Sequence, residues 1–424
     1  MTLEKRWGTI GRSVVILLAL LLLDGGSVTG QVFYNNFLGS LLQLNPDGTS
    51  KPIQIGNLPF AAEPVFSNDG RFLAVRSVDP NRPNQISSNI YVFDRVDGGL
   101  QQVTTFEDTF DPKTGNNFTY APLYKTFSPD GSQLFVVMFK TVTTNKQGLG
   151  TTVLFAVYQT SDLVPPLAGP FVITNTDPLN TIGLGVSTSA SSSAVALPLA
   201  SKNGNKTTAI VAASGDNGFD KQLTFPQTGP FGPVGPVGEQ SVFMEVDCFP
   251  SFSPDGESLA YFRVDRQTIF LTDFQPAQLS LRISDANGDR AIFSKFNPGL
   301  FPTGLNWTPD GSQLVFSIAK QETSGFFGFI PQPGTSEVAT INVDGTGIRQ
   351  LVPQGSSPAV APVLGPSNII LGDVNLDGVV DFFDISPFIE ILSSQGFQTE
   401  ADLDLDLDVD FFDIAPFIAV LSGQ

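Results

Sequence analysis

The sequence predicts a mainly-β fold, a closed ring of six four-stranded blades, followed by a small α-helical domain with two acidic loops. Three observations lead to this prediction. A Phe-Ser-Pro-Asp-Gly turn recurs along residues 31–371, the same region contains almost no helical periodicity, and one carboxylate-rich loop occurs twice within residues 372–424. Recurrence of this kind indicates a repeat architecture in which each unit packs against the next.

The N-terminal residues predict a secretory signal peptide, residues 1–30, that is cleaved from the mature chain. Lys5, Arg6 and Arg12 precede the apolar run 14–23, which small residues follow. This run is too short to span a bilayer comfortably, and an uncleaved anchor is the alternative. No other apolar run is long enough for a membrane helix, so we expect a protein that is secreted or located at the cell surface or in the periplasm, with no membrane span in its mature form.

A ten-residue turn segment occurs four times in the predicted ring. It starts with an aromatic residue, continues as Ser/Thr-Pro/Asn-Asp-Gly and ends in apolar residues that alternate with others. Proline fixes φ at the first turn position, Asp accepts backbone hydrogen bonds and Gly takes the positive φ, so each copy predicts a β-hairpin. The copies lie at residues 66–75, 127–136, 252–261 and 307–316, with degraded copies at 186–197 and 363–371.

A second element, an outer strand pair, occurs six times. The first pair, 41–55, has no hairpin before it, and the last hairpin-like segment, 363–371, has no outer pair after it. Together they complete a sixth blade that both ends of the ring share. Such a blade closes the ring and hides edge strands that would otherwise promote aggregation. The other outer pairs lie at residues 90–106, 153–174, 209–225, 279–293 and 338–352.

These repeats resemble the TolB-like six-bladed β-propeller family, whose blades carry the same turn. The resemblance implies a six-bladed propeller over residues 31–371. Blades of about 57 residues are longer than the ~40 to 45 residues of WD-type blades, so the surplus must lie in loops such as 226–238. The alternative is a set of unrelated turns in β-sandwiches.

The C-terminal domain, residues 372–424, begins with a loop that has the ligand spacing of an EF-type calcium site. Side-chain ligands stand at loop positions 1, 3, 5, 9 and 12, a backbone carbonyl at position 7, and glycine at the sharp bend of position 6. Calcium tolerates irregular geometry, so alternate residues of a tight loop can all supply oxygens to it. In order of position, the predicted ligands are Asp373, Asn375, Asp377, Val379, Asp381 and Asp384.

A second copy of the loop keeps these offsets. Its position 6 is Leu407, and a side chain in the left-handed conformation costs about 1 to 2 kcal/mol. We therefore expect two Ca²⁺ sites, of which the second is weaker. The alternative for either loop is an acidic, solvated tail. The predicted ligands are Asp402, Asp404, Asp406, Asp408 through its carbonyl, Asp410 and Asp413.

Each loop continues into Phe-Phe-Asp-Ile-(Ser/Ala)-Pro-Phe-Ile, so the whole unit was duplicated. Two loops, each followed by one helix, resemble a type I dockerin. The resemblance implies calcium-dependent docking to a cohesin domain. In that family the two residues before the last ligand are usually small or hydroxylic. Here they are Phe382-Phe383 and Phe411-Phe412, so we expect a cohesin-like or other extracellular protein bound through these rings. Alternatively, the rings fill the core between the helices.

The composition excludes several function classes. The chain contains no histidine, which excludes Ser-His-Asp and Cys-His catalysis, a His-Glu-x-x-His zinc site and a haem held by histidine. Its 22 basic and 41 acidic residues give a net charge of −19, which disfavours nucleic acid as a partner. Cys248 is the only cysteine, so no intramolecular disulfide can form, and we expect it to be a buried apolar residue.

Two functions fit these observations. The first is a secreted, non-catalytic recognition protein whose propeller binds a glycan or protein while the tail docks to a partner. The second is an enzyme acting on polysaccharide or lactone in the propeller channel. Glu63, Glu245 and Asp247 precede inner hairpins and are candidates to line the channel mouth. Three or more carboxylates and amides there would indicate catalysis, and apolar and hydroxyl residues would indicate binding, which we favour.

Overall fold

The structure is a computed structural model of the chain. The predicted signal peptide lies outside the described residues, apart from residue 30. The structure describes residues 30–36, 40–44, 49–59, 61–82, 84–96, 98–144, 149–160, 168–176, 186–189, 195–200, 208–213, 219–224, 228–233, 240–268, 274–295, 300–320, 335–362, 371–375, 379–394, 396–404 and 408–422.

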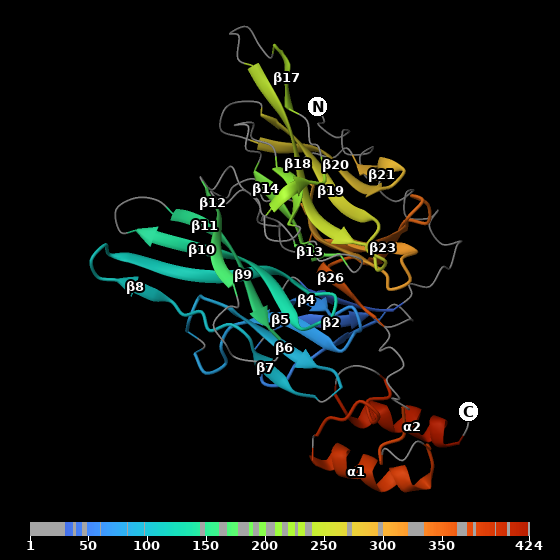
Figure 1. Cartoon of the computed structure of the whole chain (residues 1–424). Coiled ribbons are helices and arrows are strands. Elements are labelled where there is room, and N and C mark those ends of the chain that lie inside the picture. Colours follow the sequence, from blue (N-terminus) through green and yellow to red (C-terminus); the bar gives the residue numbers. More distant parts are fainter. Residues whose placement is uncertain are drawn as a thin grey trace, which may run out of the picture.

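Strands dominate the described chain and form five sheets, in which all neighbouring strands but one pair are antiparallel (Figure 1). Two of the smaller sheets follow the chain in simple order. One consists of β4 (Ala62–Phe66), β5 (Phe72–Ser77), β6 (Asn89–Asp94) and β7 (Leu100–Gln102), and another of β22 (Leu300–Trp307), β23 (Gln313–Lys320), β24 (Glu337–Asn342) and β25 (Arg349–Val352). A third contains β8 (Thr109–Asp111), β9 (Asn116–Phe127), β10 (Gln133–Thr144), β11 (Leu149–Gln159) and β12 (Ala168–Thr176).

The prediction of six separate blades is wrong in number, because two of the expected blades belong to one nine-stranded sheet. A single parallel pairing, Thr208 with Val246, joins the two runs of strands. The hairpin patterns in the sequence predict antiparallel pairing of consecutive strands, so they could not predict this parallel pairing between strands that are far apart in the chain. The main path is β13 (Ser187–Thr188), β14 (Val195–Ala200), β15 (Thr208–Ala213), β18 (Gln240–Phe252), β19 (Leu259–Thr268), β20 (Phe274–Asp285) and β21 (Gly288–Lys295), with β16 (Phe219–Gln222) on β15 and β17 (Thr228–Pro233) on β18.

The fifth sheet joins the two ends of the propeller region. Its order is β26 (Ser356–Ala361), β1 (Gln31–Asn35), β2 (Leu41–Leu44) and β3 (Ser50–Pro52), and Val32 pairs with Val360. A shared closing sheet was predicted, but its C-terminal strand is not the expected 363–371, of which residues 363–370 lie outside the described residues. Four consecutive buried residues end β26, so this strand lacks the alternating pattern that would have revealed it.

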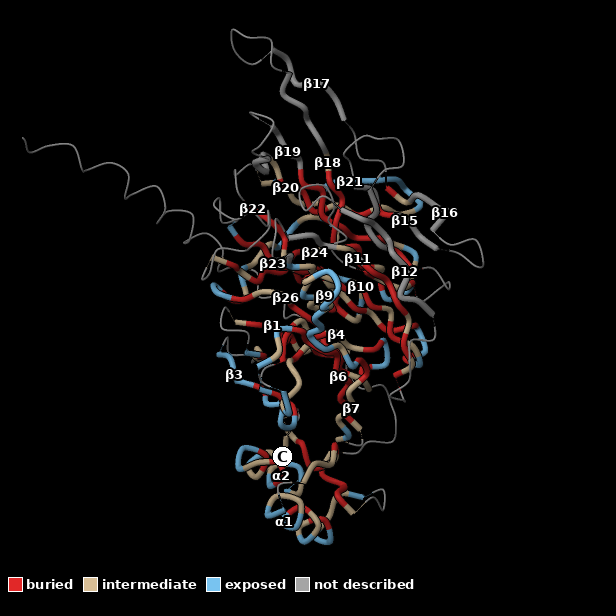
Figure 2. Tube along the Cα trace, turned by 90° about the vertical axis from the view of Figure 1, so that its left-hand side faces the viewer, coloured by how far each residue is buried: buried red, intermediate tan, exposed pale blue. Residues whose placement is uncertain are grey.

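The innermost strands of these sheets contact one another in a closed cycle. The cycle runs β4, β9, β13, β18, β22 and β26, and β26 contacts β4 again. Buried residues line the strands through the body of the ring (Figure 2). Aromatic rings connect neighbouring sheets: Phe262 of β19 and Phe316 of β23 meet edge to face, with centroids 5.9 Å apart. This arrangement of strands is that of a β-propeller.

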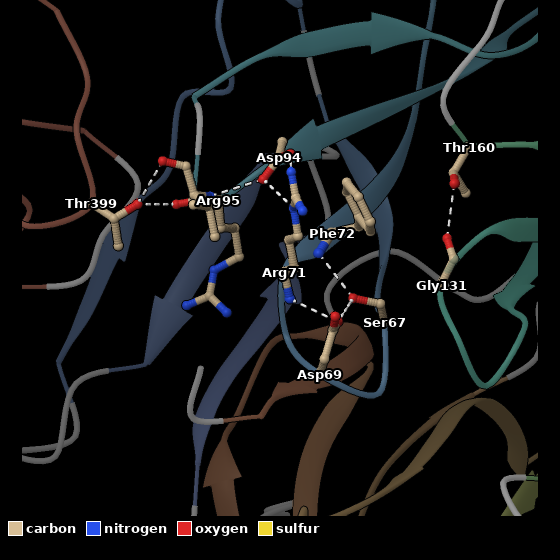
Figure 3. A network of polar contacts seen from close by, with 10 residues as sticks. Ser67, Asp69, Arg71, Phe72, Asp94, Arg95, Gly131, Thr160 and Thr399 are labelled. Atoms are coloured by element: carbon tan, nitrogen blue, oxygen red, sulfur yellow. Dashed lines mark hydrogen bonds and ion pairs between the residues drawn. The ribbon is translucent and has the colours of Figure 1, made fainter. Parts of the chain in front are cut away.

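The repeated turn has the predicted chemistry. In the first copy the Ser67 hydroxyl donates to Asp69 (2.5 Å) and accepts from the backbone N–H of Phe72 (2.9 Å), as Figure 3 shows. Asp69 also accepts from the backbone N–H of Arg71 at 3.0 Å. The glycine that follows has φ +77°, which a residue without Cβ adopts at little cost. The same bonds recur around Asp130, Asp255 and Asp310.

The C-terminal tail folds as two short helices, α1 (Ile385–Ser394) and α2 (Ile414–Leu421), each preceded by a 3₁₀ turn. Proline stands near the start of each helix, where its missing N–H costs nothing. The rings of Phe388 and Phe417 stack between the helices with centroids 4.1 Å apart. Across the described part of the chain, no helix is long and apolar enough to cross a membrane.

The tail lies next to β7 at the edge of the propeller (Figure 1), and Lys51 of β3 forms an ion pair with Asp404 of the tail. The hydroxyl of Thr399 donates to the backbone carbonyls of Arg95 and Val96, the latter at 3.1 Å (Figure 3). Phe397 meets Phe93 edge to face, with centroids 5.6 Å apart. These contacts give the tail a defined position on the propeller.

Candidate functional site

The first acidic loop is held closed by its position 12 carboxylate. Asp384 is fully buried, and its two oxygens accept from the backbone N–H groups of Asn375 (2.9 Å) and Asp381 (2.8 Å). Asp381 in turn accepts from the N–H of Phe383 at 2.8 Å, which completes a capping box at the start of the 3₁₀ turn. One short side chain thus ties positions 3 and 9 of the loop to the helix that follows.

The second loop has the same design. Asp413 is fully buried and accepts from the N–H groups of Leu403 (2.7 Å), Asp404 (3.1 Å) and Asp410 (2.8 Å). Asp410 accepts from the N–H of Phe412 at 2.7 Å. The duplication seen in the sequence is therefore also a duplication of hydrogen-bond geometry.

Carboxylates converge in the second loop. One oxygen from each of Asp402, Asp404 and Asp413 lies within 4.8 Å of the others, and Asp408, Asp410 and Asp413 form a second such group. Burial and the Asp410 carboxylate raise the pKa of Asp408, and burial raises that of Asp413. Concentrated, partly buried carboxylates are costly unless a cation neutralises them, and hard oxygen donors at this spacing suit Ca²⁺.

An orphaned oxygen supports this fit. Oδ1 of Asp404 is buried and has no hydrogen-bond partner among the described residues, while its Oδ2 pairs with Lys51 at 3.1 Å. Of the other predicted ligands, Asp373 and Asp402 are buried, whereas Val379 is exposed. Asp377, Asp406 and the position 6 residue Leu407 lie outside the described residues.

The paired aromatic residues are on the surface. Phe382, Phe383, Phe411 and Phe412 are 79, 72, 77 and 64% exposed. They lie between the two members of each capping box, where the backbone is fixed by Asp side chains on both sides. The core of the tail is filled instead by Val374, Phe388, Ala401, Val409 and Phe417. The rings thus do not fill the space between the helices.

Two of the acidic candidates in the propeller form one ion-pair group away from the central cavity. Asp247 is fully buried and forms a bidentate pair with Arg263 (2.7 and 2.9 Å), which also lies 3.3 Å from Glu245. Burial raises the pKa of Asp247, although Arg263 opposes this. Glu63 does line the cavity, but both its carboxylate oxygens are 2.9 Å from the Arg76 guanidinium. Arg263 is thus shared by two carboxylates, whereas Glu63 has Arg76 as its partner.

The cavity at the centre of the ring has a volume of about 120 Å³ and is lined by residues of β4, β9, β13, β18, β22 and β26. Besides Glu63 its lining is apolar, aromatic, hydroxyl and amide, with one lysine, Lys125. Sequence reasoning missed this lysine. A signal was present, since Lys125 stands two residues before the aromatic of the repeated turn, where other copies have Pro64, Pro250 and Leu305.

No family model and no curated protein matches this chain. Among solved structures it is similar to TolB from Acinetobacter baumannii, with 17% identity over 82% of this chain and 70% of that chain and a TM-score of 0.47. It is also similar to the β-propeller domain of the Trilobed protease from Pyrococcus furiosus, with 10% identity over 78% of this chain and 93% of that chain and a TM-score of 0.34.

Proposed function

We propose that this protein is a secreted, non-catalytic binding protein whose tail folds around calcium and docks to another extracellular protein. The exposed pairs Phe382-Phe383 and Phe411-Phe412 form the docking surface, and the partner presents an apolar face to them. One observation carries the proposal. Four large rings remain exposed in a tail that has its own aromatic core, and exposed aromatic groups of this kind mark interaction sites.

Calcium would order this surface. Each Phe pair directly follows the position 9 carboxylate and precedes the position 12 carboxylate, so ligands on both sides of the rings would be fixed together. The residues that would hold the ions are those of the two loops, with Asp402, Asp404 and Asp413 supported by the geometry of the described residues. We expect the second site to be the weaker one because of Leu407.

The cavity supports binding rather than catalysis. Among the described residues that line the cavity, Glu63 is the only carboxylate, and it forms an ion pair with Arg76. A polysaccharide- or lactone-cleaving site would need acid, base or metal-binding groups that converge on one point. The lining of hydroxyl, amide and apolar groups instead fits recognition of a ligand.

A capture experiment with the full chain tests the proposal. Immobilised protein should retain one or more secreted proteins in calcium and release them in chelator. Phe382→Ser combined with Phe411→Ser should abolish this capture while calorimetric calcium uptake stays intact. The matched control is Ile86→Ser, which removes an apolar side chain of the propeller that is 77% exposed. Capture that persists in the Phe variant, or that disappears equally in the control, contradicts the proposed surface.

A further inference from the structure

The central cavity is surrounded by strained backbone. Among the residues that the structure describes, three non-glycine residues have positive φ, namely Glu63 (54°), Phe249 (52°) and Ser357 (50°), and all three line the cavity. Each directly precedes a proline and lies where the pairing of its strand shifts register. Such bulges and left-handed residues are costly, and they are concentrated at sites where a ligand is held.

Lys125 projects from β9 into the same region. It is only 4% exposed, and its ammonium group donates to the backbone carbonyl of Glu63 at 2.5 Å. Among the described residues no carboxylate forms an ion pair with it, because the side chain of Glu63 is engaged by Arg76. An ammonium group has three donors, so two remain for a ligand.

The charges around Lys125 leave a positive excess. The titratable groups that act on it are Glu63 on β4 and Arg76 on β5. Tyr124, its neighbour on β9, lies near the same two groups and near Cys248 of β18. Burial lowers the pKa of Lys125 to about 8, with a further lowering by Arg76 and an opposing effect of Glu63. Two cations therefore share one carboxylate in a partly buried site, and an anionic ligand would balance the remaining positive charge.

We propose that the central cavity binds a small organic monocarboxylate, whose carboxylate pairs with Lys125 and whose apolar part lies against the rings of Tyr124 and Phe249. The two rings meet edge to face with centroids 5.7 Å apart and form an apolar wall of the cavity. Thr126 and Ser251 line the same cavity and add hydroxyl donors. A volume of about 120 Å³ suits an acid of few carbon atoms. This site is separate from the tail and does not depend on calcium.

The test compares propionate with its neutral isostere propionamide. Propionate should raise the thermal unfolding temperature of the full chain in a concentration-dependent manner, and propionamide should not. Lys125→Met should weaken propionate binding about 10- to 100-fold, the loss expected for one charge-assisted hydrogen bond. The control Lys113→Met removes an exposed lysine and should bind propionate like the unmodified chain.

A second measurement holds even if Lys125→Met fails to fold. A carboxylate beside Lys125 raises the pKa of its ammonium group, so binding near pH 8 should take up protons, seen by calorimetry in two buffers of different ionisation enthalpy. Equal effects of propionate and propionamide on the unmodified chain would overturn the proposal and leave Lys125 as a bridge between strands. Binding without proton uptake, or unchanged binding by a folded Lys125→Met variant, would overturn it as well.

Discussion

The ammonium group of Lys51 lies 3.1 Å from Oδ2 of Asp404, so a residue of the propeller strand β3 neutralises position 3 of the second acidic loop. The same group lies 5.2 Å from the centre of the Phe412 ring. One lysine of the propeller therefore contacts both a proposed calcium ligand and a proposed docking residue. The propeller and the tail are linked electrostatically at this point.

Removing this lysine should strengthen calcium binding. A calcium ion that takes Asp404 as a ligand must compete with the Lys51 ammonium group. Partly exposed ion pairs are worth about 0.2 to 1 kcal/mol, so Lys51→Met should raise the affinity of the second loop by roughly 1.4- to 5-fold. Calorimetric titration of the full chain measures this, with Lys113→Met as the control. A lower affinity in Lys51→Met would show that the lysine supports the loop instead.

Two glycines with the same conformation allow a test of the contact between tail and ring. Gly98 has φ +68°, and an added Cβ would lie 2.6 Å from Cδ1 of Phe397 in the tail. Gly131 has φ +70°, and its added Cβ would meet nothing closer than 3.5 Å. Both Gly→Ala changes cost about 1 to 2 kcal/mol for the backbone. Gly98→Ala should in addition displace the tail, seen as faster proteolysis between residues 363 and 400, and Gly131→Ala should not. Equal cleavage of the two variants would show that Phe397 does not anchor the tail.

The repeated turns should make the propeller sensitive to acid. The hydroxyl of Ser128 and neighbouring N–H groups lower the pKa of Asp130, and the equivalent groups around Ser253 lower that of Asp255. Because the pKa is lower in the folded state, the stabilisation is present above the unfolded value near 3.9 and is lost as the pH falls through the folded value. Asp130→Asn with Asp255→Asn should flatten the acid branch of the curve of unfolding free energy against pH. Glu257→Gln is the control, and an unchanged acid branch in the double variant would contradict this.

The pair of Asp247 and Arg263 should be structural. Removing one partner leaves a buried charge, which typically costs about 3 to 5 kcal/mol. Arg263→Met should therefore destabilise the chain strongly in denaturant titrations at neutral pH. Without Arg263 the pKa of the buried Asp247 rises further, so the loss should shrink as the pH is lowered and the carboxyl group is protonated. Adding Asp247→Asn should restore part of the stability, and a failure to do so would argue against charge burial as the cause.

The sequence by itself determined the repeated turns and the acidic loops, because each depends on interactions between residues that are close together in the chain. The Ser-Asp-Gly turns form because one hydroxyl, one carboxylate and one flexible backbone position act within five residues, as they do around Ser67 and Ser253. The acidic loops form in the same local way, since Asp384 and Asp413 bind N–H groups at most ten residues away. The mainly-β class and the closing of the ring by its two ends followed from the order of these parts.

The tertiary structure decided what depends on distant residues. The parallel pairing of Thr208 with Val246 merges two expected blades into one sheet, and the closing strand is Ser356–Ala361, without a pattern that marks it. The Phe pairs are exposed because the stacked rings of Phe388 and Phe417 occupy the space between the two helices. The isolation of Lys125 depends on the pairing of Glu63 with Arg76 across β4 and β5, a contact that no local motif encodes. The burial of a side chain and the balance of charge around it depend on many residues that are distant in the sequence, so only the tertiary structure determines them.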